Sequence, residues 1–257
     1  MTDIEVYKIL VDTVNIISRT KYVKYFAIKG GLVLVTKMFE HNREDMFRRT
    51  TDVDIHCNSK EIWESFCRNC EGILNENRQG LVYRLIKRRA DTKGLDTSDS
   101  LQFNVQTTTG ESTVIKMDMN IKSNDSIQVQ FDINLNMYTY NELTMLADKL
   151  VVVSSQSVYR RIKDLYDLCV LASMYNFRLS DISSILMQKH NRKFTDLTNM
   201  LVPQNFGELS HAYDKYKGIV NKQTFGIVLN LAQQFLYPIY TNYSKDAVWD
   251  CEHTMWR

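Results

Sequence analysis

The sequence predicts an α+β protein, with a mixed sheet and flanking helices in the N-terminal half and an all-helical C-terminal half. Strand-like stretches gather between residues 81 and 134, whereas apolar residues recur at helical spacing after residue 141. With 24% charged and 44% hydrophobic residues and only 2 Pro, the 257 residues have the composition of a globular protein without long linkers. We therefore expect two domains, residues 1–140 and 141–257.

The first domain is expected to contain helices and strands in alternation. Helices are predicted where apolar residues recur every three or four positions, at residues 3–19, 30–40 and 59–74. Strands are predicted where apolar residues alternate or run together, at residues 25–28, 50–57, 81–89, 101–108, 113–121 and 128–134.

The second domain is expected to contain helices throughout. Their predicted positions are residues 142–154, 159–175, 180–190, 206–217 and 223–237. The chain has no apolar run near eighteen residues and no signal peptide at its start, so we expect no membrane association. Five cysteines, an odd number without a disulfide pattern, indicate the reducing cytoplasm.

Two carboxylates on one predicted strand are the strongest sign of chemistry. The segment TTDVDIH alternates, so Asp52 and Asp54 point to one face and Val53 and Ile55 to the other. Carboxylates about 7 Å apart on one strand face suit hard cations such as Mg²⁺ or Mn²⁺. The pair therefore indicates a metal-dependent enzyme.

A glycine turn precedes these carboxylates. Gly30 and Gly31 follow Lys29 between a short strand and a helix. Glycines there let the backbone approach a phosphate, and the start of the helix favours an anion. Together with the two aspartates, the turn indicates an enzyme that handles a nucleoside triphosphate.

These motifs resemble those of the AbiEii/AbiGii toxin family within the nucleotidyltransferase superfamily. The resemblance rests on KGGLVL at residues 29–34, RRTTDVDI at residues 48–55 and RRIKDLYDL at residues 160–168. The spacing differs, since the twenty residues 32–51 separate the glycines from Asp52, and we expect a loop or an extra helical turn at residues 40–47. The resemblance implies nucleotide transfer from a triphosphate, with RNA (transfer RNA first) as acceptor. It also implies a cognate antitoxin and a helical domain that completes the active site.

A third metal carboxylate is expected from a neighbouring strand. Asp118 lies mid-strand in TVIKMDMNI, with its apolar neighbours Met117 and Met119 on the opposite face, and the superfamily implies an acid at this point. An exposed strand carboxylate is the alternative for Asp118, and Asp132 is its rival as ligand.

The resemblance also implies ligands for the triphosphate. Lys149, on an otherwise apolar helix, is expected to reach solvent or an anion, and the family implies that it binds the triphosphate. Arg48 is expected to contact phosphate or brace its loop, and Thr50 to orient a metal carboxylate.

The motif RRIKDLYDL offers two candidate carboxylates on one helix. Because its Lys-Asp pair matches the family motif, Asp164 is preferred as the functional residue, and Asp167 is the alternative. Asp167 is then expected to pair with Arg161 or Lys163 at the surface, where such a pair contributes about 0–1 kcal/mol.

Two other functions remain open from the residues. A glycosyltransferase also uses Asp-x-Asp to hold a metal and a nucleotide diphosphate, and a decayed transferase fold could serve as a binding module. The Lys-Gly-Gly turn disfavours the first, and the intact aspartates disfavour the second.

Basic clusters offer candidate contacts for RNA, although the net charge is only +2. Solvated element faces are the alternative explanation. The clusters comprise Arg84, Lys87, Arg88, Arg89 and Lys93, and then Lys189, His190, Arg192 and Lys193.

Overall fold

A computed structural model describes residues 1–76, 80–91, 97–121, 127–154, 158–241 and 246–257. The chain folds as two compact units. Unit 1 comprises residues 1–36, 49–125 and 129–140, and unit 2 comprises residues 37–48, 126–128 and 141–257. Residues 37–48, which a single boundary at residue 140 would leave in the first domain, thus belong to unit 2.

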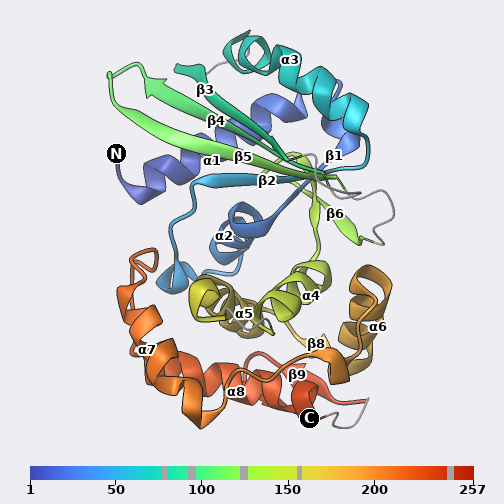
Figure 1. The fold of residues 1–257 in the computed structure, drawn as a ribbon. Helices are drawn as coiled ribbons and strands as arrows, with labels where there is room; N and C mark the ends of the chain where they lie inside the picture. Colours follow the sequence, from blue (N-terminus) through green and yellow to red (C-terminus); the bar gives the residue numbers. More distant parts are fainter. Residues whose placement is uncertain (77–79, 92–96, 122–126, 155–157, 242–245) are drawn as a thin grey trace. The chain divides into compact units, whose positions relative to one another are not determined.

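Unit 1 is built on a seven-stranded mixed sheet with the order β3-β4-β5-β2-β1-β7-β6 (Figure 1). The strands β2–β5 and β1–β7 pair in parallel, and the other neighbours pair antiparallel. The bounds are β1 Phe26–Lys29, β2 Asp52–Cys57, β3 Leu81–Asp91, β4 Thr97–Thr107, β5 Ser112–Ile121, β6 Val129–Asp132 and β7 Met137–Tyr140.

Two helices cover one face of this sheet. They are α1 (Asp3–Ser18) and α3 (Lys60–Glu76), which contact each other and the strands. Each helix begins at a residue suited to cap it, since Thr2 forms a capping box with Glu5 and the Ser59 hydroxyl accepts the Ile62 N–H. The buried rings of Trp63, Phe66 and Phe26 pack between helices and sheet. This helix-covered face is the core of unit 1.

Unit 2 is mainly helical. Its helices are α4 (Glu142–Val153), α5 (Ile162–Met174), α6 (Leu179–His190), α7 (Phe206–Lys215) and α8 (Phe225–Thr241). Helix α5 contacts α4, α7 and α8, and nearly all of its residues are buried. Short 3-10 helices lie at η2 (Glu44–Met46), η3 (Val158–Arg161), η4 (Phe194–Asp196) and η5 (Pro203–Asn205), and in unit 1 at η1 (Val23–Tyr25).

The predicted α+β class and mixed sheet are confirmed, with two corrections. The all-helical description of the C-terminal half omits a three-stranded antiparallel sheet, β8 (Phe177–Arg178), β9 (Val248–Asp250) and β10 (Met255–Trp256). The prediction also missed β7, the partner of β1. These strands are two to four residues long and pair with distant segments, so the local pattern carries little sign of them. Trp249 and Phe235 pack on the small sheet's buried side.

Candidate active site

The glycine turn and the Asp-x-Asp strand lie in contact in unit 1. Helix α2 (Gly30–Glu40) begins directly after β1, at Gly30, whose φ of +73° is a left-handed conformation that glycine adopts readily. A Cβ placed on Gly30 would lie 2.0 Å from Oδ2 of Asp54. Only a glycine therefore lets the Asp54 carboxylate occupy this position over the start of the helix.

The three predicted metal carboxylates share one face of the sheet. Asp54 on β2 pairs with Asp118 on the parallel strand β5, and Asp52 lies two residues before Asp54. Val53 and Ile55 alternate with them and are fully buried on the helix-covered face. Asp118 accepts an ion pair of 2.5 Å from Lys116, which is two residues away on the same face.

The carboxylates suit a hard dication by their chemistry and their backbone register. Among the residues that the structure describes, however, no three His, Cys, Asp or Glu side chains are gathered into a metal-binding group. Asp118 is instead turned to Lys116. The rival Asp132 is buried at the end of β6, where its Oδ1 accepts the N–H groups of Asn134 and Leu135 and closes a turn.

Side chains around these aspartates differ partly from expectation. The Oγ1 of Thr51 lies 3.2 Å from Oδ1 of Asp52, while Thr50, the predicted orienting residue, is buried. Lys29 pairs with Asp54 across the strands and places its Nζ 5.7 Å from the ring centroid of Tyr140. Gly31 is buried in the first turn of α2.

A second charged cluster is buried in unit 2. Asp167, fully buried on α5, accepts two hydrogen bonds from Arg48, at 2.5 Å from Nε and 2.8 Å from Nη2. Lys149 on α4 lies 2.7 Å from Asp167 and 2.5 Å from Asp164. Two cations thus balance two anions inside the unit, as burial of charge requires.

The cluster overturns the predicted surface position of Asp167. Its partners are Arg48 and Lys149 instead of Arg161 or Lys163, and nearly all of the residues of α5 are buried around it. Burial alone raises the pKa of Asp167, but the nearby Arg48 and Lys149 charges more than offset this and lower the pKa to about 2. Asp167 is therefore a charged residue of the core.

Arg48 and Lys149 are held in this cluster by the same charges. Arg48 is 3% exposed and hydrogen-bonded to Tyr216, which favours the bracing role over direct contact with phosphate. Burial lowers the pKa of Lys149, but the charges of Asp167 and Asp164 raise it above its usual value. The anions that Lys149 meets are thus carboxylates of α5.

Asp164 differs from Asp167 in one respect. Its side chain is also buried, and Oδ1 receives Lys149, but Oδ2 has no hydrogen-bond partner among the residues that the structure describes. A buried oxygen of this kind costs free energy unless a further donor reaches it. Oδ2 of Asp164 can therefore accept a hydrogen bond from a further donor.

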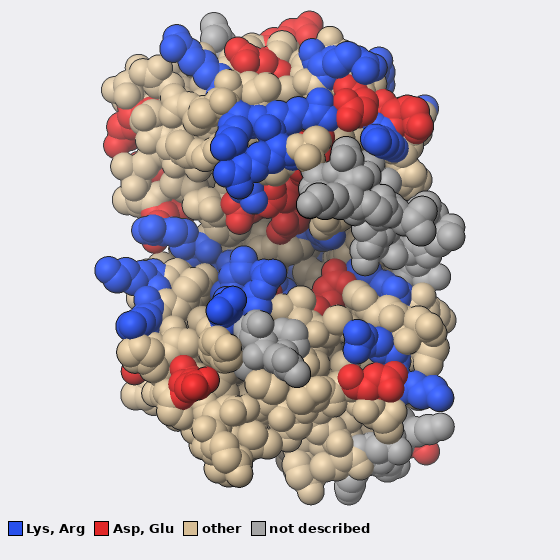
Figure 2. Space-filling view, viewed as in Figure 1, with Lys and Arg blue, Asp and Glu red and all other residues tan. Residues whose placement is uncertain are grey.

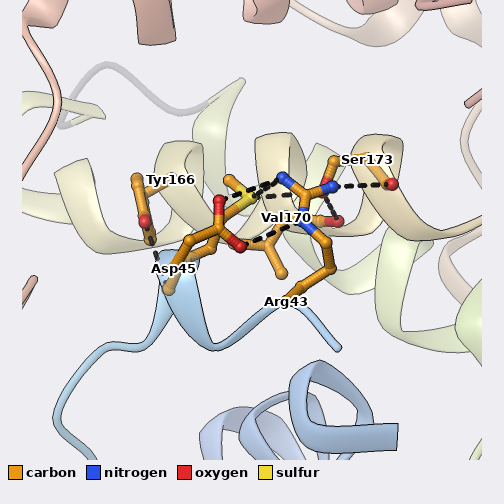
Figure 3. Close-up of polar contacts among 6 residues, drawn as sticks. Arg43, Asp45, Tyr166, Val170 and Ser173 are labelled. Carbon is orange, nitrogen blue, oxygen red and sulfur yellow. Dashed lines mark hydrogen bonds and ion pairs between the residues drawn. The ribbon is translucent and has the colours of Figure 1, made fainter. Parts of the chain in front are cut away.

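The segment of residues 43–48 is joined to α5 by hydrogen bonds (Figure 3). Tyr166 donates its hydroxyl to the carbonyl of Met46, and Arg43 donates to the carbonyl of Ser173. Arg43 also pairs with Asp45 within the segment. The extra residues predicted at 40–47 thus form a turn and η2 that bring Arg48 to Asp167.

The basic clusters are divided by the structure. Arg84, Lys87 and Arg89 are exposed on β3, whereas Arg88 turns to the helix-covered face and pairs with Glu64 and Asp99. In the second cluster, Lys189 and His190 both contact Asp148, while Arg192 and Lys193 are exposed. Lys93 lies outside the described residues.

Comparison with known proteins decides the family. Residues 14–226 match the family described as "Nucleotidyl transferase AbiEii toxin, Type IV TA system". The chain belongs to the AbiEii family. The match covers the glycine turn, the aspartates and the α5 motif, and it confirms the predicted resemblance to this family.

Other comparisons add less to the AbiEii assignment. A crystal structure of the Megavirus polyadenylate synthase matches with a TM-score of 0.43 and 12% identity, over 68% of this chain and 32% of that one. The chain thus spans about one third of the length of the polyadenylate synthase. No curated protein matches the sequence. None of the described helices is long and apolar enough to cross a bilayer.

Proposed function

We propose that this AbiEii-family protein transfers a nucleotide from a nucleoside triphosphate to RNA, with transfer RNA as the first acceptor to test. It would do so with Mg²⁺ or Mn²⁺, in a toxin–antitoxin or phage-defence system of the cytoplasm. The observation that supports the proposal best is the contact between Gly30 and Asp54. It places a glycine turn suited to phosphate beside a carboxylate suited to a divalent metal.

The residues of unit 1 would hold the metal and the triphosphate. Asp52, Asp54 and Asp118 offer carboxylate oxygens on one face of β2 and β5. A dication bound there would neutralise charge on the phosphates and lower the barrier to displacement. Lys29 and the backbone of Gly30 and Gly31 would hold the triphosphate at the start of α2.

The residues of unit 2 would support the reacting groups. We assign Lys149 to the triphosphate and Asp164 to the acceptor hydroxyl, since Oδ2 of Asp164 is buried without a donor among the described residues. Arg48 and Asp167 position these two through the shared ion pairs. In the transfer, the acceptor oxygen bonds to the α-phosphorus, the bond to pyrophosphate breaks, and the hydroxyl proton passes to a carboxylate.

The test is incubation of the protein with each α-labelled triphosphate, Mg²⁺ and transfer RNA, followed by a denaturing gel. We expect label on RNA with the native chain and its loss with Asp52→Asn or Asp54→Asn, since each removes one anionic oxygen but keeps the shape. Asp246→Asn, an exposed aspartate of unit 2, is the control. Full labelling by folded Asp54→Asn would disprove the assignment. If the label appears on the protein and not on the RNA, the acceptor is a protein and not RNA.

A further inference from the structure

The face of the unit 1 sheet opposite α1 and α3, here called the aspartate face, carries polar side chains in rows beside the aspartates. The pairing of the strands fixes its rows. Asp54 lies opposite Asp118, Asp118 opposite Ser100, and Ser100 opposite Arg89. The next row runs from Asp52 through Lys116 and Gln102 to Lys87, and a third joins Arg84 to Asn104 and to the exposed Val114.

A β-bulge places two of these cations on the aspartate face. The pairing of β3 with β4 skips Ile86, so that Leu85 lies opposite Phe103 and Lys87 opposite Gln102. Without the extra residue, Lys87 would lie opposite Leu101 and point to the helix-covered face. The bulge thus moves Lys87 and Arg89 to the side that carries Asp54, and leaves Arg88 to pair with Glu64.

The three cations of β3 are available for an outside ligand. Arg84, Lys87 and Arg89 are exposed, and none is paired to an acidic side chain within the described part of the chain. Figure 2 shows Lys and Arg side chains gathered over β3, β4 and β5 in unit 1, with acidic side chains next to them. From β2 to β3 the sheet spans three strand spacings, about 14 Å, or roughly four stacked nucleotides.

We propose that Arg84, Lys87 and Arg89 form a cationic track that binds the phosphodiester backbone of the acceptor RNA and leads it toward Asp54. The inference rests on the proposed function, since it names how that acceptor is held. Unpaired cations interleaved with hydroxyl and amide side chains match phosphate and sugar groups. An acidic protein surface is disfavoured, because protein interfaces have an apolar centre and the two rows that join β3 to Asp52 and Asp54 are polar throughout.

The test compares two triple variants with the same loss of charge. The track variant is Arg84→Gln, Lys87→Gln and Arg89→Gln. The control variant is Lys8→Gln, Lys60→Gln and Arg68→Gln, which removes exposed cations from the helices on the other face. Binding of a fluorescent single-stranded RNA and of transfer RNA is measured by anisotropy over a series of salt concentrations.

We expect the track variant to bind RNA about tenfold or more weakly than the native chain and the control variant. The slope of log affinity against log salt should decrease by about 2, at roughly 0.7 for each lost phosphate contact. Binding of Mg²⁺ and a nucleoside triphosphate should be unchanged in both variants, since the track lies outside the triphosphate site.

If the two triple variants bind RNA with equal affinity, the track is rejected. Labelling of RNA by the native chain would still support the proposed function in that case. A native chain that neither binds nor labels RNA would instead reject the RNA acceptor itself, and the track with it. Loss of antitoxin binding by the track variant, with RNA binding retained, would reassign this face to a protein partner.

Discussion

At the scale of single residues, Gly30 is the position least tolerant of substitution. Gly30 has a positive φ, and Asp54 occupies the space where its Cβ would lie. Gly72 on α3 differs on both counts, since it is helical and a Cβ there would meet nothing within 4 Å. The two glycines therefore form a matched pair for experiment.

We predict that Gly30→Ala abolishes nucleotide transfer and destabilises the protein by about 1–3 kcal/mol, from the strained φ and the displaced carboxylate. Gly72→Ala should keep full activity and gain up to about 1 kcal/mol, because alanine favours the helix. Urea denaturation and the gel assay measure both effects. Retained activity in Gly30→Ala would show that the Asp54 carboxylate can move without cost to transfer.

At the scale of elements, helix α5 carries two carboxylates in different situations. Asp167 accepts from both Arg48 and Lys149, so its loss removes a carboxylate partner from two buried cations. Loss of Asp164 leaves Lys149 paired to Asp167. The surface pair predicted for Asp167 would contribute only about 0–1 kcal/mol.

We predict that Asp167→Ala lowers the free energy of unfolding of unit 2 by about 3–5 kcal/mol, the cost of breaking a buried ion pair. Asp164→Ala should cost only about 1–2 kcal/mol while it removes activity. A Trp63→Phe background leaves Trp249 and Trp256, both in unit 2, as the fluorescent reporters. If Asp167→Ala fails to fold, Asp167→Asn, which keeps the volume, replaces it, and a cost below that of Asp164→Ala would contradict the ranking.

The same elements show what the sequence can reveal. The bounds of α2 are as predicted, because the glycine turn starts the helix, and the alternation in β2 correctly placed Asp52 and Asp54 on one face. The partner of Asp167 could not be found by spacing, since Arg48 lies 119 residues away. The apolar residues on every side of Asp167 in DLYDLCVLASM were the available sign that it is buried and needs a cation.

Other features depend on strand register and on side-chain rotation. The bulge at Ile86 is visible only in the register between β3 and β4, and no local pattern in RLIKRR specifies it. The contact of Thr51 with Asp52 depends on a side-chain rotation that the strand pattern leaves open. Strand register and side-chain direction could therefore not be predicted from the sequence.

At the scale of the whole molecule, the buried cluster predicts how stability varies with acid. The pKa of Asp167 falls from 3.8 to about 2 on folding, so this group stabilises the folded state above the unfolded pKa. That contribution is lost as pH falls through the folded pKa, and its size is on the order of 2 kcal/mol. The difference in unfolding free energy between the native chain and Asp167→Asn should be constant above about pH 5 and shrink between about pH 4 and 2. Urea titrations of both proteins across this range measure it, and a difference that does not change with pH would contradict the assignment.

The separation of 119 positions between Arg48 and Asp167 also has a consequence for synthesis on the ribosome. Residues 37–48 leave the ribosome early but belong to a unit whose main part follows residue 140. At translation rates of about 5–20 residues per second, Arg48 waits about 6–24 s for its carboxylate. Unit 2 cannot be completed in that interval, so the nascent chain carries an unpartnered cation and an unfinished core until its second half has emerged. A molecule that binds the nascent chain therefore has this interval in which to bind before unit 2 is folded.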